Sequence, residues 1–68
     1  MNEDVFNMSL RKYLKKVGIT GQREIETAVR DGLSSGRLKG NEKLPAKVTL
    51  TLGGTELNLL VDGEIELE

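Results

Sequence analysis

The spacing of the apolar residues changes once along this chain, and the change separates a helical part from a strand part. Up to residue 33 the apolar side chains recur every three or four positions, which is typical of helices with one buried face. From Ala46 they recur at every second position, which is typical of half-buried strands. The pattern therefore predicts an α+β fold in which the helices precede the strands.

Two helices are predicted in the first part, over residues 5–17 and 19–33. Asn2 is the expected N-cap of the first helix, Gly18 its expected left-handed stop, and Thr20 the expected cap of the second. The two apolar stripes consist of Phe6, Leu10, Tyr13, Leu14 and Val17, and of Ile25, Ala28, Val29, Gly32 and Leu33.

Three antiparallel strands are predicted in the second part, over residues 46–52, 55–60 and 64–68. The glycines at 53–54 are typical of a two-residue hairpin turn, which would place Leu50 opposite Leu57. The second connection is predicted as a bulged loop over 61–63, because that loop keeps the leucines on one face.

These elements predict two N-terminal helices packed on one face of a three-stranded antiparallel β-meander, with residues 1–68 as a single domain. The expected core consists of Leu50, Leu57, Leu59 and Ile65 beside Phe6, Leu10 and Ile25. So short a chain buries only a small core. It has no Cys and no His, so disulfides and the usual zinc sites cannot supplement it. Good packing or self-association must do so instead.

The charge is nearly balanced overall but unevenly distributed. The net charge is −1, which argues against a protein that binds nucleic acid by bulk charge. Residues 1–43 carry nine Lys/Arg and six Asp/Glu, whereas residues 44–68 carry one Lys and five Asp/Glu. The cations Arg11, Lys12, Lys15 and Lys16 lie on the face of the first helix opposite its stripe. A solvated face that complements the helix dipole is the favoured interpretation, and nucleic-acid binding by this face is the alternative.

No catalytic, cofactor or metal site is predicted, and no small-molecule ligand is indicated. A nucleophile paired with a histidine base is excluded by composition, and the glycine spacing does not fit a phosphate-binding loop. Alternate carboxylates on a strand lie about 7 Å apart, too far for one tight calcium loop. The acidic residues Asp62, Glu64, Glu66 and Glu68 are therefore interpreted as a charged edge that discourages aggregation. The chain is not expected to be an enzyme.

The predicted function is a small structural or protein-interaction module that binds a protein partner or itself, with a homodimer as one form. Its candidate partner-binding residues are Arg11, Lys12, Lys15, Lys16 and Leu60, the last being a large apolar residue on the solvent side of its strand. No apolar run is long enough to span a membrane, and the acidic opening is unlike a signal peptide, so a cytoplasmic location is expected.

The whole chain also resembles a family of short, uncharacterised bacterial proteins known as a domain of unknown function. The resemblance rests on the segments MNEDVFNMSLRKYLKKVG, REIETAVRDGLSSGRLKGNE and LLVDGEIELE. It implies a free-standing small protein and brings no activity, substrate, cofactor or functional residue with it.

Overall fold

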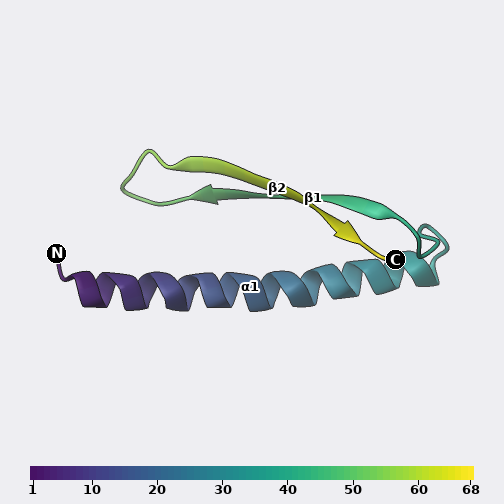
Figure 1. Ribbon diagram of the computed structural model, residues 1–68, viewed down its shortest axis with the longest axis horizontal. Helices are drawn as coiled ribbons and strands as arrows, with labels where there is room; N and C mark the ends of the chain where they lie inside the picture. Colours follow the sequence, from purple (N-terminus) through teal and green to yellow (C-terminus); the bar gives the residue numbers. More distant parts are fainter. The chain divides into compact units, whose positions relative to one another are not determined.

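The computed structural model describes residues 1–68 and contains one helix and two strands (Figure 1). Helix α1 spans Glu3–Ser34, strand β1 spans Lys43–Thr51 and strand β2 spans Asn58–Glu66. The chain forms two compact units, Met1–Arg37 with the helix and Leu38–Glu68 with the strands. The predicted arrangement of two helices and a three-stranded meander is therefore wrong, because the protein has one helix and one two-stranded hairpin.

The two predicted helices are a single helix, which Figure 1 shows as an unbroken ribbon. Gly18 does not adopt the left-handed conformation that would stop it, since the only residues with positive φ are Gly36, Gly40 and Gly54. A glycine costs a helix about 1 kcal/mol relative to alanine but does not remove a hydrogen bond, as a proline would. The glycines at 18 and 21 therefore weaken α1 without interrupting it.

The predicted N-cap of α1 is confirmed, and the helix ends just before a glycine with positive φ. The side-chain oxygen of Asn2 accepts a hydrogen bond of 3.1 Å from the Val5 amide, which satisfies one of the unpaired donors of the first turn. At the other end the Gly36 amide donates to the Leu33 carbonyl over 3.2 Å, with Gly36 at φ 80°. Glycine suits this position because a side chain would strain the left-handed backbone.

The hairpin pairs β1 with β2 antiparallel from Lys43 opposite Glu66 to Thr51 opposite Asn58. Leu50 lies opposite Leu59, two positions away from the predicted Leu57. Within the longer connection, the Thr55 amide donates to the Leu52 carbonyl over 3.2 Å, so a turn does form at the glycines at 53–54. This turn lies inside a loop over 52–57 and does not join the two strands directly.

The predicted loop over 61–63 and residues 64–66 of the predicted third strand are parts of β2, which ends at Glu66. Continuing the strand through Asp62-Gly63 pairs these residues with Lys47 and Ala46, at the start of the predicted first strand. It also places Val61 opposite Val48. These additional pairs outweigh the local turn preference of Asp-Gly, because cross-strand pairs are what stabilise a sheet.

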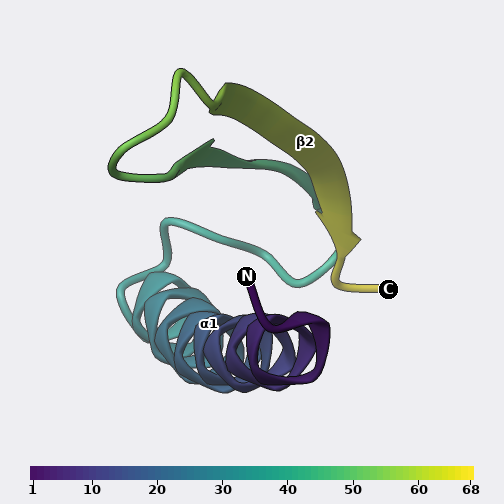
Figure 2. The same ribbon diagram turned by 90° about the vertical axis from the view of Figure 1, so that its left-hand side faces the viewer.

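Alternation along the strands gives the hairpin two different faces, and Figure 2 shows the two strands running side by side. We call one the hairpin apolar face; it contains Leu44, Ala46, Val48 and Leu50 of β1 and Leu59, Val61, Gly63 and Ile65 of β2. The opposite face carries all the charged residues of the strands, together with Leu60 opposite Thr49. The predicted sides of Leu50, Leu59 and Leu60 are confirmed by this register.

Glu42 holds the segment that enters β1. Its carboxylate accepts hydrogen bonds from the amides of Lys39 at 2.8 Å and Gly40 at 2.9 Å, and its carbonyl accepts one from the Leu67 amide at 3.1 Å. The Lys39 amide, followed by that of Gly40, lowers the pKa of the Glu42 carboxyl below its usual value. The charged form of this carboxyl therefore stabilises the base of the hairpin.

Neither unit buries an apolar side chain within itself, so no member of the predicted core is enclosed by its own unit alone. Among its expected members, Phe6 is 45% exposed, Ile25 42% and Leu59 50%.

Candidate interaction surfaces

The apolar residues of α1 form one stripe that passes through the predicted break. We call it the helix seam; its members are Phe6, Leu10, Leu14, Val17, Gly21, Ile25, Ala28 and Gly32. Their spacings follow an 11-residue repeat of three, four and four positions. Since 11 residues in three turns give about 3.67 residues per turn, close to the natural 3.6, the seam runs almost straight along the helix. Neither predicted helix alone showed this repeat.

The helix seam changes character along its length. Its first four members are large. The two most exposed of them are Phe6, with 45% of its surface exposed, and Leu14, with 48%. Three of its last four members are small, namely Gly21, Ala28 and Gly32. A Cβ atom added at Gly21 would have no neighbour within 4 Å in the chain itself. Nothing within the helical unit therefore requires a glycine at this position.

The predicted basic residues lie together on the exposed surface of α1. Arg11, Lys12, Lys15 and Lys16 occupy two successive turns, and the helical repeat directs them away from the centre of the helix seam. Because the helix continues, Arg23 and Arg30 extend the row on the same side. Leu60 is in the other unit, on the charged face of the hairpin, with 54% of its surface exposed.

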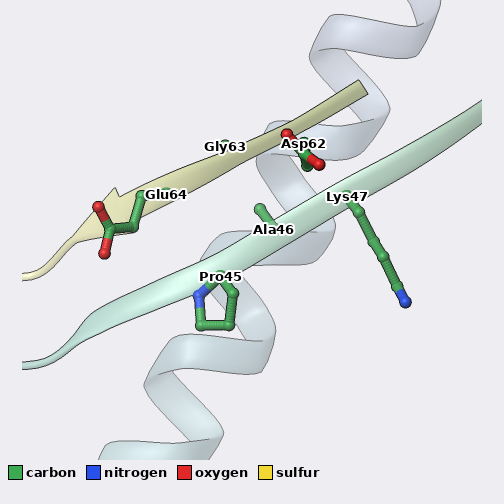
Figure 3. A pocket seen from close by; sticks show the side chains of 6 residues that line it. All are labelled: Pro45, Ala46, Lys47, Asp62, Gly63 and Glu64. Carbon is green, nitrogen blue, oxygen red and sulfur yellow. The ribbon is translucent and has the colours of Figure 1, made fainter. Parts of the chain in front are cut away.

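A shallow open hollow lies over the middle of the hairpin (Figure 3). It is lined by Pro45, Ala46, Lys47, Asp62, Gly63 and Glu64. The Lys47 side chain extends away from β2, so it does not close over Asp62 as an ion pair. No group of three or more acidic, histidine or cysteine side chains is placed to hold a metal ion. The hollow thus has side chains of opposite charge around a floor of strand backbone. Its lining contains no nucleophile paired with a general base.

Helix α1 lacks an apolar stretch that could span a membrane.

The surfaces that stand out are the helix seam and the hairpin apolar face, both of which are contiguous and apolar. The sequence analysis did not identify the hairpin apolar face in its observed form, because it assigned Val61 to a loop and omitted Leu44 from the first strand. The apolar residues at every second position, Leu59, Val61 and Ile65, were the signal that could have identified it.

Together these features define a small α+β protein with a long amphipathic helix and a two-faced hairpin, neither of which encloses a hydrophobic core by itself. The chain belongs to a family of unknown function, DUF6494, whose family model matches residues 1–68. The resemblance to a domain of unknown function is thereby confirmed. Neither a curated protein nor a solved structure matches the chain.

Proposed function

We propose that this protein is a structural, protein-interaction module that self-associates and acquires its hydrophobic core when copies assemble. The observation that carries the proposal is that neither unit buries an apolar side chain within itself, although each presents a contiguous apolar surface. Monomeric proteins rarely expose apolar patches larger than a few hundred Å².

The composition leaves association as the main source of stability. Two-stranded hairpins are marginally stable on their own, and isolated helices gain most of their stability from packing an amphipathic face. Without Cys or His the chain has no disulfide or zinc site to replace that packing. The proposal assigns no catalytic role, and the cytoplasmic location expected from the sequence stays a prediction.

Sedimentation velocity and light scattering between about 1 and 500 μM test this function, combined with thermal unfolding at each concentration. A self-associating chain sediments as an oligomer and melts at a temperature that rises with protein concentration, since subunit association stabilises only the folded state. A monomer that unfolds cooperatively at a concentration-independent temperature would overturn the proposal, because it would have a core within one chain.

Nucleic-acid binding is the second candidate, and one observation favours it. The continuous helix aligns Lys12, Lys16, Arg23 and Arg30 on one side, over a length that spans several phosphates. The unit Leu38–Glu68 weighs against it, with three Lys/Arg and six Asp/Glu. Titration of fluorescent duplex DNA and RNA at two salt concentrations separates the candidates: tight binding that weakens steeply with salt would favour this second function.

A further inference from the structure

We infer that the occupant of the helix seam is the helix seam of a second copy, running antiparallel with Phe6 level with Gly32. This inference rests on the self-association proposed above and specifies its geometry. It follows from three properties of α1: the repeat of the seam, the sizes of its residues and the distribution of its charges.

The repeat makes the seam suitable for another helix of the same kind. Knobs of one helix stay aligned with a partner only if the apolar positions remain on one side over the whole contact. The 11-residue repeat achieves this over the length of α1 with little supercoiling. The contact therefore extends over eight seam positions, from Phe6 to Gly32.

Residue sizes along the seam favour the antiparallel direction, in which three of the four layers pair a large residue with a small one and the fourth brings Leu14 close to Ile25. In one register, Phe6 is level with Gly32, Leu10 with Ala28, and Val17 with Gly21 of the second copy. Each of these layers combines one large and one small residue, and the two-fold axis repeats every layer. A parallel pair would instead place Phe6 against Phe6 and leave Gly21 facing Gly21, which crowds one end and leaves voids at the other. Close-packed interfaces tolerate neither well.

The charges favour the same direction. The first half of α1, through Val17, has four Lys/Arg and two Asp/Glu, whereas the second half has two Lys/Arg and three Asp/Glu. Antiparallel packing places the positive half beside the negative half of the second copy. A parallel pair would bring the cluster Arg11–Lys16 against its own copy, which costs free energy at low ionic strength.

Paired spin labels distinguish the two directions directly. Ser9→Cys and Thr20→Cys introduce the only cysteine of each variant, and the two exposed positions lie 11 residues apart on the same side of α1. In the proposed register Ser9 is level with Val29 of the second copy and Thr20 with Gly18. With about 1.5 Å of rise per residue, the Ser9 labels are then separated along the axis by about 30 Å and the Thr20 labels by about 3 Å.

The expected result is a label distance at Ser9 about 20 Å longer than at Thr20, with helix axes about 8–10 Å apart. Equal distances at the two positions would show a parallel pair and overturn the inference while leaving self-association intact. Long distances at both positions in an oligomer would show that the copies associate through another surface, which also overturns it. A monomer in both variants contradicts the proposed function itself.

An exchange of residues within one layer tests the register. Gly21→Val alone is expected to weaken association by about tenfold, because the added side chain meets Val17 of the second copy. The double variant Val17→Gly/Gly21→Val has the composition of the natural chain and again places one large side chain in the layer. Its association constant should lie within about threefold of the natural protein. A double variant no better than Gly21→Val would show that these two positions do not face each other.

Discussion

At the scale of single residues, Glu42 gives the hairpin unit a dependence on pH. Its pKa is lowered, mainly by the Lys39 amide, so its hydrogen bonds stabilise the fold above the ordinary glutamate range. That stabilisation is lost as the pH falls through the lowered pKa, when the carboxyl becomes protonated. The Lys39 and Gly40 amide protons should therefore shift in an NMR titration with a midpoint below the value of a free glutamate.

Two variants are the controls for this titration. Glu42→Gln should abolish the shift of both amide protons over the same pH range, whereas Glu56→Gln in the exposed hairpin loop should leave it unchanged. A shift that persists in Glu42→Gln would mean that another carboxyl reports at these amides.

Two glycines in open surroundings should respond oppositely to alanine. A Cβ at Gly18 or at Gly36 would have no neighbour within 4 Å, so sterics between elements do not decide the outcome. Gly18→Ala should stabilise the helix by about 1 kcal/mol, since alanine is the better helix former. Gly36→Ala should destabilise it by a similar amount, about 1 kcal/mol, because φ is 80° there. Helix content and urea midpoints by circular dichroism measure both, and a loss in Gly18→Ala would indicate that this position is packed in the assembly.

At the scale of elements, the sequence predicted which strand residues share a face but not where each strand begins and ends. Alternation placed Leu50, Leu59 and Leu60 on their correct sides, because side-chain direction in a strand depends only on the parity of the position. The turn at Asp62-Gly63 was predicted from a local preference that the pairing with Lys47 and Ala46 overrides. Register is a property of two segments at once, so a single strand's pattern could not supply it.

The extent of the helix likewise could not be predicted from the residue type at one position. Gly18 has the residue type of a stop, but a stop also requires a left-handed backbone, and the continuing seam from Val17 to Gly21 keeps the helix regular. The capping by Asn2 and the end at Gly36 were predictable because both are made by neighbours in the sequence. The candidate basic residues were likewise found on one face, whereas the hairpin apolar face needed the observed register.

The length of α1 is itself open to measurement. If one helix spans Glu3–Ser34, the double substitution Gly18→Pro/Gly21→Pro should break it in the middle, since each proline costs about 3 kcal/mol inside a helix. Two short helices joined at these glycines would tolerate the change. Helical chemical shifts at residues 17–22 in the natural protein, and their loss together with association in the variant, are the expected outcome. Retention of the oligomer would contradict a continuous helix.

At the scale of the whole molecule, two neighbouring residues of β2 report whether association also covers the hairpin. Leu60 and Val61 are 54% and 53% exposed in a single chain, but they lie on opposite faces. In the proposed assembly the hairpin apolar face is covered and the charged face stays in water. Val61→Asn should therefore weaken association by about tenfold or more, because it places an unpaired amide in the interface. Leu60→Asn should leave the sedimentation profile of the natural protein unchanged. The two side chains are almost equally exposed in a single chain, so equal effects of the two variants would mean that association does not distinguish the faces of the hairpin. The interface would then be restricted to α1.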